Sequence, residues 1–327
     1  MNENRLKSET RSSSQAPSFQ HFTDVVDHAP AELHALLDLA DAIATNPDRL
    51  TGSQKGRLLV NLFYEPSTRT RLSFEVAAKR MGMHVTNVSS AGSSVEKGES
   101  LEDTFDTVQA LSPDCVVLRH PEPGAAARMA ALAGQGLHVI NAGDGIGAHP
   151  TQAMLDALTL RQAFGSLDRV RLVMAGDIRH SRVARSAIHL FPMMGISEIR
   201  LCGPADFMPG EKLLAAGGAA LSRFERLEDA LPGANAIMML RIQKERISSA
   251  EIPAAAEYHR QWGLRPEHLE LAEPECRVLH PGPMNRGVEI ASEVADGPNS
   301  LIRTQVRNGL FLRMALLQCL LQGHPSS

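Results

Sequence analysis

Apolar runs of strand length recur along this chain of 327 residues, and helix-length segments separate most of them. Such alternation predicts an α/β fold with parallel sheets, because the chain must cross back over the sheet before each new parallel strand. We therefore expect doubly wound parallel sheets. The predicted strands span residues 58–63, 83–88, 114–118, 137–140, 170–175, 199–202, 236–240 and 276–279.

The chain is longer than one ordinary domain, so we expect two domains with the active site in the cleft between them. Hydrophobic residues make up 43% of the sequence, which is enough for real cores. The expected division is a mobile polar tail over 1–17, a first domain over 18–155 and a second over 156–300. A terminal helix over 301–322 should pack back on the first domain. Its apolar pattern consists of Ile302, Val306, Leu310 and Leu317.

The segment 65–71 (Glu-Pro-Ser-Thr-Arg-Thr-Arg) places three hydroxyl and two guanidinium groups directly after a predicted strand. A helical pattern with apolar residues at 74, 77, 78 and 81 follows, so the hydroxyls lie at a helix N-terminus. Free N–H groups and the helix dipole favour a phosphate there, and Arg69 could add two charge-assisted hydrogen bonds. The competing interpretation is a capping box with a solvated arginine face.

Polar groups also follow other predicted strands at the point where these end. They are Arg119 and His120, Arg241 and Gln243, and His280 and Pro281. Ligands of open α/β sheets bind beyond the carboxyl ends of the strands, so these groups should converge. A lone arginine at a strand end is usually only solvated. Several clusters rich in Arg and His and poor in carboxylates predict an anion site.

Three further segments allow two interpretations each. The loop 89–97 is rich in small polar residues and by itself indicates a flexible linker. His149 follows a glycine-rich turn and is either structural or a donor to a carbonyl oxygen that becomes negative in a transition state. Ser181 is expected to cap a helix, and Arg182 in the first turn of that helix could bind an anion.

The formal net charge of -4 and the pI near 6.4 give no reason to expect a nucleic acid or a membrane surface as partner. No run approaches roughly 18 consecutive apolar residues and the N-terminus lacks an apolar signal core, so we expect a soluble, unexported protein. The four cysteines, at 115, 202, 276 and 319, have no paired spacing. They are expected to be reduced core residues of a cytoplasmic protein rather than zinc ligands or disulfides.

Several motifs, in this order from about residue 18 to 322, resemble those of aspartate carbamoyltransferase catalytic chains. They are 63–71 (FYEPSTRTR), 97–100 (KGES), 119–120 (RH), 149–152 (HPTQ), 241–246 (RIQKER) and 280–287 (HPGPMNRG). The Ser-Thr-Arg-Thr turn is shared with ornithine carbamoyltransferases, so the second-domain motifs decide the acceptor. Ornithine enzymes typically carry His-Cys-Leu-Pro late in the chain, whereas this chain reads His-Pro-Gly-Pro at 280–283.

The resemblance implies a role for each matching residue. The phosphate of carbamoyl phosphate would be held by Ser67, Thr68, Arg69 and Thr70. Its carbonyl oxygen would be polarised by Thr70, Arg119 and His149, and its amide bound by Gln152. The two carboxylates of L-aspartate would be gripped by Arg182, Arg241 and Gln243, with main-chain contacts from Gly282 and Pro283; some family members carry leucine at position 282.

In the family, the serine and lysine of the loop come from a neighbouring subunit. Ser93 and Lys97 would then complete another chain's site, with Lys97 beside both substrates, and the active unit would be a homotrimer. The implied catalytic residues are Arg69, Thr70, Lys97, Arg119 and His149. Larger bacterial assemblies pair the catalytic trimer with a dihydroorotase-like chain or a zinc-bearing regulatory chain, and either could dock on this one.

The implied reaction is direct attack of the uncharged α-amino group of aspartate on the carbamoyl carbon, an early step of pyrimidine biosynthesis. No metal or organic cofactor is implied. Clamping two charged substrates suggests domain closure, with 246–263 as the mobile loop.

Two other interpretations remain open. An ornithine-type or other carbamoyltransferase would keep the first domain and change the acceptor, but the arginines of the second domain argue against a cationic acceptor. A catalytically silent subunit with a structural or regulatory role would be expected to lose Arg69, Lys97 or His149, and all three are present.

Overall fold

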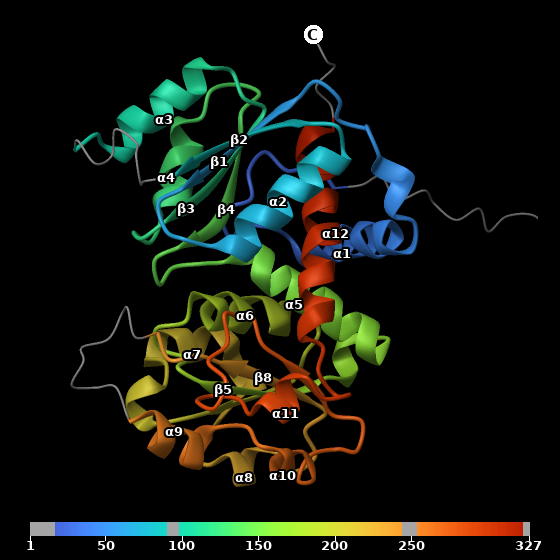
Figure 1. Cartoon of the computed structure of the whole chain (residues 1–327), viewed down its shortest axis with the longest axis vertical. Helices are drawn as coiled ribbons and strands as arrows, with labels where there is room; N and C mark the ends of the chain where they lie inside the picture. The colour runs from blue at the N-terminus through green and yellow to red at the C-terminus, as the bar shows by residue number, and fades with distance from the viewer. Residues whose placement is uncertain (1–16, 90–97, 244–253, 323–327) are drawn as a thin grey trace, which may run out of the picture.

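The computed structural model describes residues 17–89, 98–243 and 254–322. Most of the predicted tail, together with the loop residues Ser93 and Lys97, lies outside these ranges. The described chain forms two lobes, each built on one parallel sheet, and the long helix α12 (Ile302–Leu321) runs from one lobe to the other (Figure 1). Two α/β domains with parallel sheets confirm the predicted fold class.

The sheet of the first lobe has the strand order β2-β1-β3-β4, and each neighbouring pair is parallel. Its strands are β1 (Leu58–Phe63), β2 (His84–Ser89), β3 (Cys115–His120) and β4 (His138–Asp144). Alternate residues of β1 enter different apolar cores: Leu59 and Phe63 enter one, and Val60 and Leu62 enter the other. Both faces of the sheet are therefore buried, which explains the continuous apolar runs. The helices of this lobe are α1 (Pro30–Thr45), α2 (Thr68–Arg80), α3 (Leu101–Ala110) and α4 (Ala125–Leu132).

The second sheet has the order β7-β6-β5-β8-β9 and is also parallel. Its strands are β5 (Arg171–Gly176), β6 (Glu198–Cys202), β7 (Leu221–Phe224), β8 (Ala236–Leu240) and β9 (Arg277–Leu279). Along β5, Leu172 and Met174 face one core while Val173 and Ala175 face another. The helices around it are α6 (Arg182–Met193), α7 (Glu211–Gly217), α8 (Leu227–Ala230), α9 (Ala255–Trp262), α10 (Pro266–Leu269) and α11 (Ser292–Ala295).

Strand β7 has no counterpart among the predicted strands. It lies at the edge of the second sheet and pairs only with β6 in the described structure. Its two central side chains, Ser222 and Arg223, are exposed. A short edge strand with polar side chains in solvent contains no apolar run, so the hydrophobic pattern could not indicate it.

Helices α5 (Pro150–Phe164) and α12 join the two lobes (Figure 1). Helix α12 packs against α1, α2 and α5, while α5 also packs against α6 of the second lobe. The predicted apolar face of α12 was wrong at Val306, which is 52% exposed. The buried side of the helix instead includes Gln305, Asn308 and Arg313, because α12 meets α5 partly through hydrogen bonds.

Three smaller predictions can be compared with the described structure. All four cysteines are buried and free, as expected. Of the proposed mobile loop 246–263, residues 255–262 form α9, whose Tyr258 is fully buried, and residues 246–253 lie outside the described ranges. In the described part of the chain, no helix is both long and apolar enough to cross a membrane.

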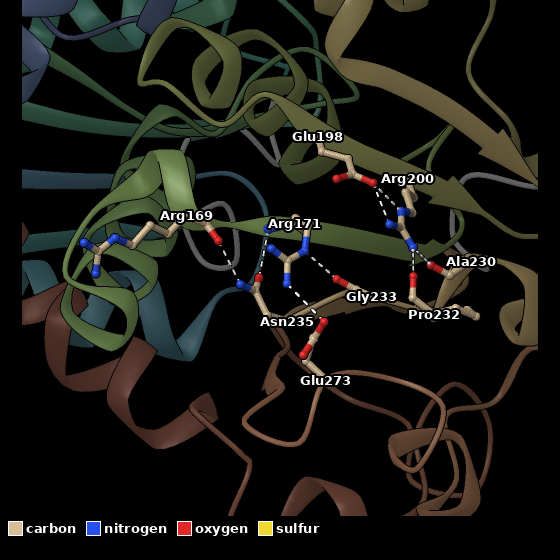
Figure 2. Close-up of polar contacts among 9 residues, drawn as sticks. All are labelled: Arg169, Arg171, Glu198, Arg200, Ala230, Pro232, Gly233, Asn235 and Glu273. Atoms are coloured by element: carbon tan, nitrogen blue, oxygen red, sulfur yellow. Dashed lines mark hydrogen bonds and ion pairs between the residues drawn. The ribbon is translucent and has the colours of Figure 1, made fainter.

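Polar contacts hold the amino ends of the strands of the second sheet (Figure 2). The Asn235 Oδ1 atom accepts a hydrogen bond from Arg171 N at 2.8 Å, and its Nδ2 donates to Arg169 O at 2.8 Å. The Arg171 side chain donates to Gly233 O and lies 3.3 Å from a carboxylate oxygen of Glu273. These contacts align β5 with β8 at the end of the sheet opposite its carboxyl edge.

Replacing Asn235 with alanine is expected to lower the free energy of unfolding by about 1 to 2 kcal/mol, because two main-chain groups lose their partners. Activity should stay at the wild-type value, since the change lies at the far end of the sheet from the cleft described below. Urea unfolding at fixed protein concentration measures the effect. Asn235→Asp keeps the acceptor and loses the donor, so its loss should be smaller. A wild-type urea midpoint for Asn235→Ala would contradict this prediction.

Candidate active site

A cleft of about 580 Å³ lies between the two lobes, at the carboxyl edges of both sheets. Every described residue of the predicted site lines it. They are Ser67, Thr68, Arg69, Thr70, Arg119, His149, Gln152, Arg182, Arg241, Gln243, Gly282 and Pro283. The cleft also includes Glu65, Pro66, Ser181, Val183 and Pro281, to which no site role was assigned from the sequence.

The turn after β1 places the N-terminus of α2 at the cleft. Ser67 is the N-cap residue, and its Oγ accepts a hydrogen bond from Thr70 N at 3.4 Å. No acidic residue stands in the first turn of α2, so the positive end of the helix dipole is not neutralised there. This end of the helix can therefore bind an anion with main-chain N–H groups and hydroxyls.

Arg69 extends from this turn toward the second lobe. Its Nη1 donates to Pro281 O at 3.1 Å, in the loop that follows β9. Neighbouring groups partly desolvate the guanidinium, which lowers the pKa of Arg69, although the residue as a whole stays exposed. An anion bound beside Arg69 would favour its charged form and would connect with both lobes.

Two arginines from different lobes share one carboxylate oxygen of Glu65. Arg182 Nη1 donates to Glu65 Oε2 at 2.7 Å, and Arg119 Nη2 lies 3.6 Å from the same oxygen. Arg119 also donates to Ala142 O at 3.0 Å, and Arg182 to Gly145 O at 3.3 Å. The side chain of Arg182 is only 6% exposed, so the carboxylate offsets the burial of its charge.

Two glycines give the arginines room. A Cβ atom on Gly143, whose φ is +112°, would lie 2.9 Å from Arg119 Nη1 and 2.9 Å from Arg182 Nε. A Cβ atom on Gly282, whose φ is +65°, would overlap the guanidinium group of Arg69. Glycine at these two positions therefore lets three guanidinium groups approach the main chain.

The remaining cleft residues are fixed by their own elements. His149 precedes α5 as its N-cap, and its main-chain N donates to Ser186 Oγ at 2.9 Å. Ser181 caps α6 by accepting from Ala184 N at 3.2 Å, as predicted, which places Arg182 in the first turn. After β8, Gln243 N donates to Asp177 Oδ2 at 3.0 Å.

Two histidines from the predicted strand-end clusters do not line this cleft. His120 is buried against Tyr64, with ring centroids 4.8 Å apart, and its Nδ1 accepts from Glu122 N at 3.1 Å. His280 is 1% exposed and lies behind the cleft wall. Burial lowers the pKa of both imidazoles, so both are suited to structural hydrogen bonds as neutral groups.

Within the described ranges, no group of three or more His, Cys, Asp or Glu side chains is arranged to hold a metal ion. The charged groups that the cleft does offer are mainly guanidinium groups, each able to bind a carboxylate or phosphate through two parallel hydrogen bonds. Their spacing over both lobes suits two anionic ligands bound side by side.

The fold and the cleft together define a two-domain α/β enzyme for anionic substrates. The chain belongs to the aspartate/ornithine carbamoyltransferase family. The model of the carbamoyl-P binding domain of this family matches residues 20–162, and the model of its Asp/Orn binding domain matches residues 168–320.

Individual relatives agree with the resemblance found in the sequence. The chain is 47% identical to the aspartate carbamoyltransferase catalytic subunit of Mesorhizobium japonicum, covering 92% of this chain and 91% of that one. It is 45% identical to the corresponding subunit of Brucella anthropi, covering 92% of each. The aspartate transcarbamoylase of Trypanosoma cruzi, solved with N-(phosphonacetyl)-L-aspartic acid, superposes with a TM-score of 0.84 at 30% identity, covering 94% of this chain and 96% of that one. The predicted kinship with aspartate carbamoyltransferase catalytic chains is therefore confirmed.

Proposed function

We propose that this chain transfers the carbamoyl group of carbamoyl phosphate to the α-amino group of L-aspartate, giving N-carbamoyl-L-aspartate and phosphate, an early step of pyrimidine biosynthesis. The observation that carries this proposal is a cleft in which the turn at the N-terminus of α2 in one lobe faces arginines from the other lobe. Two dianionic substrates need such a set of cations. The similarity to aspartate carbamoyltransferases supports aspartate as the acceptor.

The first lobe would bind carbamoyl phosphate. Ser67, Thr68, Arg69 and Thr70 surround the N-terminus of α2 and would hold the phosphate. Thr70, Arg119 and His149 would donate to the carbonyl oxygen, where negative charge grows in the transition state. Gln152 would bind the amide group.

The second lobe would bind the acceptor. Arg182 and Arg241, with Gln243, would hold the two carboxylates of aspartate, and the main chain at Gly282 and Pro283 would contact the aspartate as well. Arg182 already binds the Glu65 carboxylate, so its geometry suits an anionic oxygen. A cationic acceptor such as ornithine would meet like charge in this half of the cleft.

The uncharged α-amino nitrogen would attack the carbamoyl carbon directly, and the bond from this carbon to the phosphate oxygen would break in the tetrahedral intermediate. The proton lost by the nitrogen would leave with the phosphate. No side chain need act as nucleophile. Holding the two reactants in register could contribute about 7 to 11 kcal/mol. One donor to the developing oxyanion, of the Arg119 or His149 kind, is worth roughly 3 to 4 kcal/mol.

The proposal also assigns each domain of the chain to one of the two substrates. Residues 18–155 form the carbamoyl phosphate domain, 156–300 the aspartate domain, and helix 301–322 belongs with the first. Ser93 and Lys97 would enter a neighbouring subunit's cleft, which makes the active unit a homotrimer of a cytoplasmic enzyme. A dihydroorotase-like or regulatory chain could dock on that trimer.

The test is product formation by the purified chain from carbamoyl phosphate with either L-aspartate or L-ornithine. Turnover with aspartate alone is the expected result. Turnover with ornithine would overturn the acceptor assignment, and the absence of turnover with either would support a silent subunit instead.

A further inference from the structure

A buried hydrogen-bond network lies beneath the cleft, where α5 meets α12. Gln152 Nε2 donates to Asp156 Oδ1 at 2.9 Å, and Gln305 Nε2 donates to the same oxygen at 2.7 Å. The other amide atom of Gln305, Oε1, accepts from His280 N at 2.9 Å. All four residues are less than 9% exposed, and Asp156 is fully buried.

The network continues into the loop after β9. His280 Nδ1 accepts from Gly282 N at 2.8 Å, so the imidazole proton must lie on Nε2, which is 3.0 Å from Glu289 Oε1. Burial lowers the pKa of His280, in agreement with a neutral ring. A continuous path of short hydrogen bonds thus leads from Gln152 on one wall of the cleft to Gly282 on the other.

Asp156 decides which atom of Gln152 is available to a ligand. Because Nε2 of this amide is engaged with Asp156 Oδ1, its Oε1 is the atom left to accept a hydrogen bond. The NH₂ group of a carbamoyl moiety is a donor and requires such an acceptor. Without Asp156 the amide of Gln152 could rotate and present its own NH₂ group, which cannot accept.

The two oxygens of Asp156 differ in their surroundings. Oδ1 accepts both amide hydrogen bonds, whereas the buried Oδ2 has no hydrogen-bond partner among the described residues. Burial raises the pKa of this carboxyl group to about 7. A proton on Oδ2 would leave Oδ1 as an acceptor, so the two amide hydrogen bonds do not require the negative charge, although the nearby buried Arg313 favours it.

Helices α5 and α12 are also joined by hydrogen bonds outside this network. One turn further along, Asn308 Nδ2 donates to Thr159 Oγ1 at 2.9 Å and to Gln162 Oε1 at 2.8 Å. Asn308 is as buried as Gln305, but it does not line the cleft. A further contact, from Arg313 Nη2 to Thr151 Oγ1 at 3.3 Å, also joins the two helices. Neither Asn308 nor Arg313 lines the cleft, whereas the network around Asp156 reaches it through Gln152.

We propose that Asp156 and Gln305 are positioning residues. Through their hydrogen bonds they fix the distance and orientation of the Gln152 amide relative to the main chain at 280–283. The carbamoyl group is then held from both walls of the cleft. This inference rests on the proposed function. It predicts that breaking the network impairs substrate binding and turnover beyond what a loss of helix packing explains.

The experiment compares Gln305→Met and Asp156→Leu with Asn308→Leu as the matched control, in the full chain. Steady-state kinetics with carbamoyl phosphate and aspartate, titration with N-(phosphonacetyl)-L-aspartate and thermal melting are measured for each. The two network variants should lower kcat/KM roughly 10- to 100-fold and raise the KM for carbamoyl phosphate, since small misplacements cost that much. Asn308→Leu should lower the melting temperature by a similar amount and leave both constants within about twofold.

Asp156→Asn keeps an oxygen at Oδ1 and removes the charge, so it should retain activity within about threefold of wild type. If Asp156→Leu does not fold, Asp156→Asn still tests the role of this side chain. Equal kinetics for Gln305→Met and Asn308→Leu, or an Asp156→Asn variant as impaired as Asp156→Leu, would overturn the positioning role while the proposed function stands. A wild-type chain without turnover would overturn both.

Discussion

Arg69→Ala is expected to lower kcat/KM by roughly 10²- to 10⁴-fold, the largest effect of any single change at the phosphate turn. Two hydrogen bonds from one guanidinium to a phosphate are worth about 3 to 6 kcal/mol together, and each 1.4 kcal/mol is about tenfold in rate. Arg69 lies in the first turn of α2 and its Nη1 already donates to Pro281 O. Its loss would remove the proposed phosphate ligand and one contact between the lobes.

Two further variants separate these contributions. Arg69→Lys keeps the charge and loses the paired geometry, so it should recover only part of the activity. Arg71→Ala removes an exposed arginine from the same turn, one that does not line the cleft, and should stay within about threefold of wild type. Steady-state assays and phosphate titration measure both. Equal losses for Arg69→Ala and Arg71→Ala would refute a specific role for Arg69.

The position of the 65–71 turn at a helix N-terminus could be predicted from the sequence because all its determinants are local. A buried strand, a Ser cap and a helical pattern follow each other within 58–81, and the structure places Ser67 as the cap of α2. The convergence of Arg182 and Arg241 could be predicted as well, since parallel strands of one sheet bring their carboxyl ends to one edge, whereas Arg119 comes from the other sheet. These arguments need no knowledge of how distant helices pack.

Features that depend on packing between distant segments could not be predicted in this way. The polar side of α12 contradicts its apolar periodicity, because Gln305 and Asn308 are buried only by virtue of partners on α5, about 150 residues earlier in the chain. Strand β7 forms because the edge of β6 is available for pairing, and its own sequence contains no apolar run that would predict a strand. For α12 the deciding partner lies far away in sequence, whereas β7 depends on pairing with the strand just before it.

Glu65 is the clearest example of a site residue that sequence reasoning missed. Considered alone, a carboxylate in a cleft for anions opposes ligand binding by charge repulsion. In the structure it pairs with Arg119 of the first lobe and Arg182 of the second, through the same oxygen. It therefore compensates two guanidinium groups that would otherwise repel each other, and it keeps them oriented across the cleft before a substrate binds.

Glu65→Ala is accordingly expected to impair both stability and activity. Removing one partner of a largely buried ion pair should lower the free energy of unfolding by about 2 to 4 kcal/mol, and the loss of arginine orientation should lower kcat/KM about 100-fold. Glu65→Gln retains an oxygen acceptor and should lie between the alanine variant and wild type. Thermal melts and steady-state kinetics measure these effects.

Added anions provide the decisive readout for Glu65. Inorganic phosphate or succinate would supply negative charge to the two arginines that the variant leaves undercompensated, so ligand binding should stabilise Glu65→Ala more than it stabilises the wild type. The melting temperature of the variant should therefore rise more steeply with anion concentration. Equal shifts in the two proteins would mean that Glu65 does not compensate the arginines, and the assignment of this residue to the working site would be wrong.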